Sequence, residues 1–164
     1  MTGDPRFRYL NVFDGERFSA VIPRMPRQVA NFTWGAGQIH FQDHTGAWWV
    51  ATDEGLCGYP IVHDLKDLAR TLPEHIFTER DGLSGKTIYG MYEDSRGDVW
   101  IAVLGADDVD LWTRATGVIR RFRNDQGGKP LGTQAVYAED RAGDIWMGLY
   151  WKDLTRYRNG RFQT

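Results

Sequence analysis

The fold of this chain is decided by one short stretch, Asp94-Ser95-Arg96-Gly97-Asp98-Val99-Trp100-Ile101-Ala102. The pattern occurs twice more, at 43–51 as Asp-His-Thr-Gly-Ala-Trp-Trp-Val-Ala and at 140–148 as Asp-Arg-Ala-Gly-Asp-Ile-Trp-Met-Gly. In every copy, Asp-x-x-Gly leads into an apolar residue, a Trp and a second apolar residue. The copies begin at residues 43, 94 and 140, a spacing typical of repeated units of roughly 40 to 50 residues. The sequence therefore predicts a repeat architecture.

Each copy lies between two short segments rich in aromatic and β-branched residues, which is typical of β-strands. Asp can accept a hydrogen bond from its own backbone two residues on, and Gly adopts a positive φ without steric cost, so Asp-x-x-Gly predicts a tight turn. A second hairpin follows within each unit, and the clearest has Asn159-Gly160 at its turn. We expect first strands at 38–42, 87–93 and 134–139, and second strands at 48–52, 99–103 and 145–149.

These units predict an all-β fold of β-propeller blades, each a four-stranded antiparallel meander. We expect one partial propeller over 1–164 with ~3.5 blades. Its parts are the outer hairpin of a preceding blade at 6–20 and full blades at 37–80, 87–124 and 133–164. Apolar residues at helical spacing predict a short helical insertion near 63–72 that ends at Pro73. A closed ring takes at least about four blades, so we expect either a fragment of a larger protein or a remnant open reading frame.

Composition excludes several classes of protein. Lys and Arg number 20 against 22 Asp and Glu, so nothing favours nucleic-acid binding. The single cysteine, Cys57, excludes an internal disulfide framework. No stretch approaches the roughly 18 apolar residues of a membrane span, and the first residues lack the apolar segment of a secretion signal. The localisation stays open from the residues alone.

The pattern from Thr78-Glu79-Arg80-Asp81-Gly82-Leu83 through the motif at 94–102 to the closing hairpin resembles the two-component regulator propeller repeat. The resemblance extends from about Tyr9 to Phe162. It implies a sensor propeller of a bacterial membrane-bound regulator, with an output domain such as a histidine kinase or a diguanylate cyclase elsewhere. It also implies a periplasmic location.

The repeated motif itself is interpreted as scaffold. A Trp at one register, flanked by apolar residues in a second strand, favours packing between blades over sugar stacking. Each motif Asp stands alone at its turn, whereas a calcium site needs six or more converging oxygens. The structural motif residues are Asp43, Gly46, Trp49, Asp94, Gly97, Trp100, Asp140, Gly143 and Trp146. His40 and His44 lie roughly 13 Å apart in an extended chain, too far to share one metal ion. We expect no catalytic residue, no metal and no cofactor.

The meander topology points to a candidate ligand surface. Turns after the first and third strands share one face of a propeller, and they look uniform here. The connections on the other face differ between copies and carry aromatic and charged residues, which suits a polar ligand such as a glycan. The candidate ligand-binding residues are Trp34, Lys86, Asp107, Asp108, Tyr150 and Trp151. The alternative is that Trp34 and Trp151 only cover the junctions between blades.

The sequence thus favours a non-catalytic sensory segment of a bacterial signal-transduction regulator that binds a small molecule or glycan. One alternative is a protein-interaction module whose open ends associate with the remaining blades or with a second copy of the chain. Another is a metal-assisted lyase or hydrolase, because similar blades occur in streptogramin lyases, although no His and Glu pair of that kind is visible here.

Overall fold

The computed structural model describes residues 10–29, 33, 38–122, 134–149 and 154–163. These described residues form fourteen strands and two short 3-10 helices. The strands are β1 (Leu10–Phe13), β2 (Phe18–Val21), β3 (His40–Gln42), β4 (Trp48–Thr52), β5 (Gly55–Tyr59), β6 (His75–Phe77), β7 (Ile88–Glu93), β8 (Val99–Val103), β9 (Val109–Thr113), β10 (Val118–Phe122), β11 (Gln134–Glu139), β12 (Ile145–Leu149), β13 (Leu154–Arg158) and β14 (Arg161–Gln163).

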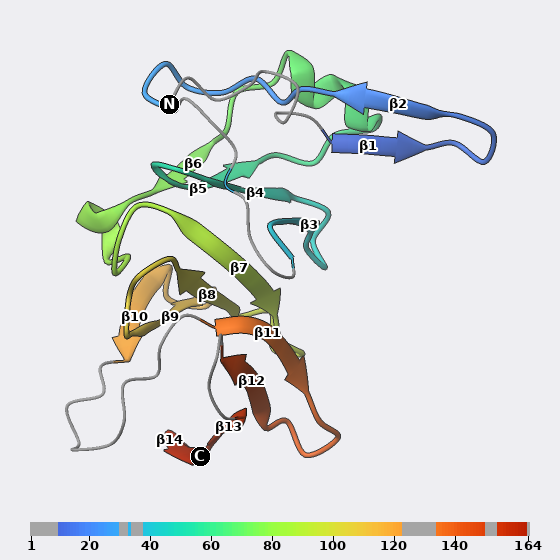
Figure 1. Ribbon diagram of the computed structural model, residues 1–164. Helices are drawn as coiled ribbons and strands as arrows, with labels where there is room; N and C mark the ends of the chain where they lie inside the picture. Colours follow the sequence, from blue (N-terminus) through green and yellow to red (C-terminus); the bar gives the residue numbers. More distant parts are fainter. Residues whose placement is uncertain (1–9, 30–32, 34–37, 123–133, 150–153, 164) are drawn as a thin grey trace.

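The strands form one two-stranded sheet and three four-stranded sheets, each hydrogen-bonded in chain order. Every pairing is antiparallel. The all-β prediction of four-stranded antiparallel meanders is therefore confirmed. We call β3–β6 the first blade, β7–β10 the second and β11–β14 the third. The sheets follow one another in a row, with β1–β2 and the third blade at opposite ends (Figure 1).

The predicted turns and second strands have the expected geometry. The motif glycines Gly46, Gly97 and Gly143 have φ values of 93°, 82° and 80°, a region that favours glycine. The second strands β4, β8 and β12 span the predicted residues. We call the side of the blades that carries the three motif turns and the Asn159-Gly160 turn the turn face. The opposite side, with the connections between blades, is the link face.

The core lies between the sheets rather than inside any one of them, because a strand presents alternate side chains to opposite faces. In β4, Val50 belongs to the cluster against β1–β2, whereas Trp49 belongs to the cluster shared with the second blade. We call the junction of the first and second blades the first seam. The junction of the second and third blades is the second seam, built around Trp100, Ile145 and Met147. The middle strands of the first and second blades are therefore buried on both sides.

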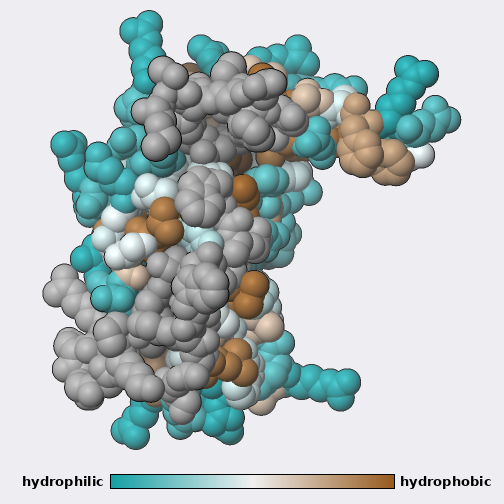
Figure 2. Space-filling model, viewed as in Figure 1, coloured by the Kyte–Doolittle hydropathy of each residue, from teal (hydrophilic) through white to brown (hydrophobic). Residues whose placement is uncertain are grey.

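The β1–β2 hairpin carries exposed apolar surface. Phe13 and Phe18 are 56% and 74% exposed, and their rings lie 4.8 Å apart. The hairpin projects from the row of sheets, and Figure 2 shows the hydrophobic surface on it. Among the described residues, none forms a helix long and apolar enough to span a bilayer.

The predicted helical insertion is a 3-10 helix, η2 (Leu65–Ala69), which buries Leu68 completely. Asp64 caps its start by accepting the backbone N–H of Lys66. It ends well before Pro73, because the N–H of Arg70 bonds the carbonyl of Asp67 and closes the last turn. The prediction that Pro73 ends the helix is therefore wrong. A second 3-10 helix, η3 (Glu79–Asp81), follows β6.

Candidate functional site

The motif Asp connects its own turn to the motif Trp. In the second blade, Asp94 Oδ1 accepts the backbone N–H groups of Arg96 and Asp98 at 3.0 and 3.1 Å. Its Oδ2 accepts the indole N–H of Trp100 at 3.1 Å. Asp43 and Asp140 make the same three bonds in the other blades. The sequence analysis predicted the turn but missed the Asp–Trp bond, although the constant six-residue spacing was a usable signal.

The motif Trp also contacts the third strand of the next blade. The Trp49 ring lies 4.8 Å from that of Trp112, and Trp100 lies 4.9 Å from Tyr157 in an edge-to-face arrangement. Trp49 and Trp100 are therefore buried between two neighbouring blades. Trp146, in the last blade, is partly exposed and stacks against Arg156 of its own sheet, with the guanidinium carbon 5.4 Å from the ring centre.

A carboxylate joins each of the first two motif turns to the following blade. Glu93, which precedes the second motif, accepts the His44 backbone N–H at 2.9 Å and bonds the His44 ring at 2.6 Å. Glu139 accepts the backbone N–H of Ser95 at 2.7 Å and its hydroxyl at 2.6 Å. The sequence analysis missed this link as well. Its signal is the Glu-Asp pair that opens the second and third motifs.

An arginine fills the first seam on the turn face. Arg114 Nη2 donates to Asp43 Oδ2 at 2.8 Å and to Glu93 Oε1 at 3.1 Å, and its Nε donates to the Gly97 carbonyl at 2.9 Å. The backbone N–H of Arg114 bonds Asp98 at 3.0 Å. The guanidinium also stacks 4.8 Å above the Trp112 ring.

This arrangement fixes the charge of Asp43. Burial alone raises the pKa of its carboxyl group. Hydrogen bonds from Thr45, Trp49 and Arg114 outweigh burial and lower the pKa of Asp43 to about 2.

The second seam lacks this arginine. Strand pairing places Trp112 opposite Val99 and Tyr157 opposite Ile145, so Asn159 is the residue that aligns with Arg114, although the two turns differ in length. Its side chain is short, and its φ of 49° places it in the left-handed turn before Gly160. Arg96, from the turn of the second blade, instead donates to Asp94 Oδ2 at 2.6 Å.

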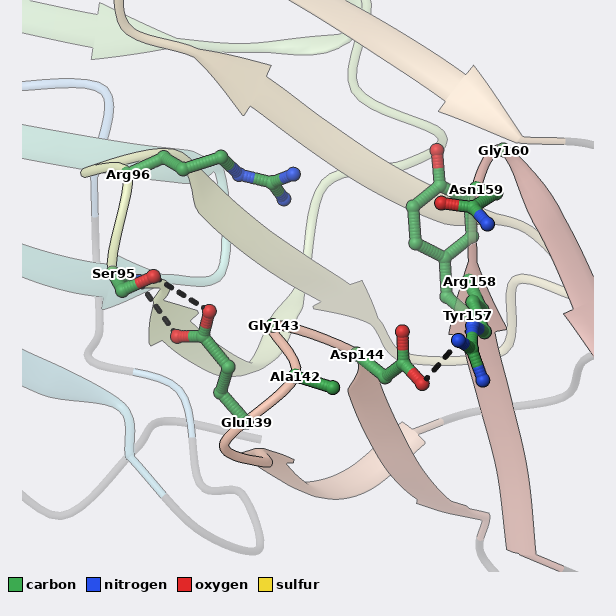
Figure 3. Close-up of a pocket in the computed structure, with 10 residues that line it drawn as sticks. All are labelled: Ser95, Arg96, Glu139, Ala142, Gly143, Asp144, Tyr157, Arg158, Asn159 and Gly160. Carbon is green, nitrogen blue, oxygen red and sulfur yellow. Dashed lines mark hydrogen bonds and ion pairs between the residues drawn. The ribbon is translucent and has the colours of Figure 1, made fainter.

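A polar cavity of about 350 Å³ opens at the second seam. Figure 3 shows Arg96 extending over it from one side, Glu139 below and the Asn159-Gly160 turn on the far side. Its walls come from two motif turns and the β13–β14 turn. The lining residues are Ser95, Arg96, Glu139, Ala142, Gly143, Asp144, Tyr157, Arg158, Asn159 and Gly160. The cavity lies on the turn face, which the sequence analysis interpreted as uniform scaffold.

The predicted ligand residues belong to the link face and are only partly described. Lys86 donates to Glu54 across the first seam at 3.2 Å, and Asp107 is exposed. Asp108 Oδ2 lies 3.8 Å from Arg121 Nε. Trp34, Tyr150 and Trp151 lie outside the described residues. The link-face site stays a prediction.

The carboxylate of Asp110, near the link face, is completely buried. Asp110 accepts the backbone N–H of Ser84 at 2.7 Å and its hydroxyl at 2.9 Å. Burial is the main cause that raises the pKa of Asp110, and Arg121 lies 3.8 Å from its other oxygen. In the described part of the chain, no group of three or more His, Cys, Asp or Glu residues could hold a metal ion.

Residues 82–105 match the family model described as "Two component regulator propeller". Among solved structures, the extracellular domain of the BT4673 hybrid two component system from B. thetaiotaomicron is 16% identical, with a TM-score of 0.70 over 95% of this chain and 21% of that one. The corresponding domain of BT3049 from the same organism is 19% identical, with a TM-score of 0.59 over 77% and 16%.

Virginiamycin B lyase from Staphylococcus aureus, in complex with quinupristin, is 15% identical, with a TM-score of 0.56 over 78% of this chain and 39% of that one. No curated protein matches the chain. This chain spans about a fifth of the length of the BT4673 domain, and at these identities the likeness shows the fold alone. The family match covers the motif at 94–102 and so confirms the sequence resemblance. The chain carries a two component regulator propeller repeat within a propeller fold of the kind found in extracellular sensor domains.

Proposed function

We propose that this chain is a non-catalytic, ligand-binding segment of the sensory propeller of a bacterial signal-transduction regulator, located in the periplasm. The main observation behind the proposal is that the motif side chains are already hydrogen-bonded within the scaffold. Each motif Asp is engaged by its own turn and Trp, and Glu93 and Glu139 are engaged by the preceding blade. These groups hold blades together rather than face a substrate, which suits a rigid receptor.

The ligand we propose is a small polar molecule, with a glycan fragment as the first choice, bound on the link face. Lys86, Asp107 and Asp108 are the described residues of that site, and Trp34, Tyr150 and Trp151 complete it. Aromatic surface beside polar groups on loops of a rigid scaffold is the composition that recognises sugars.

Thermal-shift and glycan-array screens of the chain test this proposal. We expect at least one oligosaccharide to raise the unfolding temperature, and Asp107→Asn with Asp108→Asn to remove that shift. Glu16→Gln, an exposed substitution on the distant β1–β2 hairpin, is the matched control. A folded chain that responds to no glycan would contradict the proposal. Lyase activity that is lost with a chelator would instead favour an enzyme.

A second candidate function is assembly with further blades, from a longer protein or from a second copy of the chain. It is favoured by exposed apolar residues in the third blade, where Val136 and Leu154 are 55% and 56% exposed. Sedimentation tests self-association. A concentration-dependent dimer would support a second copy as the partner, and a clean monomer at high concentration would exclude the self-completing ring.

A further inference from the structure

The two seams present equivalent acceptors, but only in the first does one guanidinium reach across the seam to all three of them. In the first seam, Arg114 contacts Asp43 Oδ2, Glu93 Oε1 and the Gly97 carbonyl. One blade later, the equivalent residues are Asp94, Glu139 and Gly143, and the last two line the cavity. The cavity therefore lies where the first seam holds an arginine side chain.

We propose that the cavity of the second seam binds a guanidinium group supplied from outside the chain, either a small guanidine compound or an arginine side chain. The site lies on the turn face and does not depend on the ligand proposed for the link face. A planar cation with several N–H donors suits a carboxylate and a carbonyl held by two neighbouring turns.

Glu139 has acceptor capacity that its counterpart has already used. Glu93 Oε1 receives both the His44 ring and Arg114, whereas Glu139 Oε1 accepts a hydrogen bond from the Ser95 hydroxyl. Among the described residues, Glu139 has no cation within ion-pair distance. A bound guanidinium would supply the contact that Arg114 makes to Glu93.

An aromatic ring is also in place. Arg114 stacks on Trp112 in the first seam, and the equivalent ring, Tyr157, lines the cavity of the second. A guanidinium held by Glu139 and Gly143 can therefore stack on Tyr157 as Arg114 stacks on Trp112, which adds a cation–π contact.

Two arginines line the cavity, and one of them, Arg96, allows a cationic ligand to be distinguished from an anionic one. Arg96 covers Asp94 Oδ2, and Arg158 Nε lies 3.7 Å from Asp144. The Arg96 side chain is 56% exposed, so it can move aside at little cost. For a guanidinium ligand Arg96 is a competitor, whereas for an anion it would be a partner, and removing it therefore has opposite effects in the two cases.

The experiment is a titration of the chain followed by the indole N–H resonances, because the Trp100 indole N–H bonds Asp94 at the edge of the site. The probes are N-acetylarginine amide and its neutral isostere, N-acetylcitrulline amide. We expect saturable shifts with the arginine probe and about tenfold weaker binding of the citrulline probe, the factor that corresponds to losing one charge-assisted contact. Equal binding of the two probes would overturn the proposal.

Two variants make the test specific. Asn159→Arg tethers a guanidinium at a residue that lines the cavity, and it should abolish binding without removing any carboxylate. Arg96→Ala should tighten binding several-fold because it uncovers Asp94. Persistent binding by Asn159→Arg, or weaker binding by a folded Arg96→Ala, would overturn the proposal. Glu16→Gln is the control for both, since it changes an exposed charge on the β1–β2 hairpin.

Two further probes distinguish the sources of the guanidinium. Agmatine represents small guanidine compounds, and the peptide acetyl-Gly-Arg-Gly-amide represents an arginine of a partner protein. Tighter binding of agmatine assigns the site to small molecules, and tighter binding of the peptide assigns it to protein arginines. Failure of all guanidinium probes would end this proposal and leave the link-face ligand untouched.

Discussion

The two seams of this propeller segment share their motif contacts but differ in the turn that follows the third strand, which spans four residues from Arg114 in the second blade and two from Asn159 in the third. Both have a motif Trp packed on an aromatic residue of the next blade and a Glu that holds the preceding turn. In the first seam Arg114 closes the turn face, and in the second Asn159 leaves a cavity. The turn after the third strand therefore distinguishes a seam bridged by an arginine from a seam that leaves a cavity. The scaffold and the variable site thus occupy the same surface.

The largest expected effect is the difference in stability lost when a motif Trp between two blades, Trp100, and the motif Trp of the last described blade, Trp146, are replaced by Ala. Trp100 is fully buried between two blades, so Trp100→Ala should destabilise the chain by about 3–5 kcal/mol. Trp146 is partly exposed in the last described blade, so Trp146→Ala should cost roughly half as much or less. Urea unfolding followed by circular dichroism measures both. Equal losses would show that a further surface covers Trp146 in solution.

The next effect compares two arginines that bond equivalent aspartates. Arg114 is 24% exposed and holds two acidic side chains, so Arg114→Ala should cost about 2–3 kcal/mol, less than breaking a fully buried pair. Arg96 is 56% exposed, and Arg96→Ala should cost at most about 1 kcal/mol. The measurement is again the free energy of unfolding in urea. A larger loss for Arg96→Ala would mean that the second seam depends on its own arginine as much as the first.

Sequence reasoning predicted the repeat and most strands because the blade scaffold uses the same residues three times. The Asp-x-x-Gly turn and the strands around it follow from local backbone preferences, and β8 has the predicted bounds. The Glu links and Arg114 were missed because each joins residues far apart in the chain. The cavity was missed for a further reason. It depends on Asn159 standing where the previous blade has an arginine, a difference visible only once strand pairing aligns the blades.

A third prediction concerns the acid stability of the first seam. The pKa of Asp43 is about 2 in the folded chain, below its usual 3.8. The ionised Asp43 therefore stabilises the fold above about pH 4, and this stabilisation is lost as the pH falls from 4 towards 2. Arg114→Met should raise the pKa of Asp43 towards its usual value and reduce that part of the pH dependence. Carboxyl NMR titration measures the pKa, and an unchanged value would show that Thr45 and Trp49 alone hold it down.

The smallest expected effect is a rise in the unfolding midpoint when free methylguanidinium fills a first seam from which Arg114 has been removed. Arg114→Ala in an Asn159→Arg background removes the native guanidinium from the first seam and blocks the cavity of the second. Methylguanidinium at millimolar concentration, far below denaturing levels, should then raise the unfolding midpoint of this double variant. A ligand that binds only the folded state raises the free energy of unfolding by RT ln(1 + [L]/Kd). A ligand concentration ten times Kd therefore corresponds to about 1.4 kcal/mol.

The single variant Asn159→Arg, with both seams filled, is the control and should not respond. Methylammonium should stabilise the double variant less, because it lacks the planar set of donors that spans Glu93 and the Gly97 carbonyl. Rescue by methylguanidinium alone would establish that these acceptors recognise the group itself rather than a tethered arginine. An absence of rescue would show that Arg114 is held mainly by its backbone bond to Asp98, and a free guanidinium would then have no comparable hold in either seam.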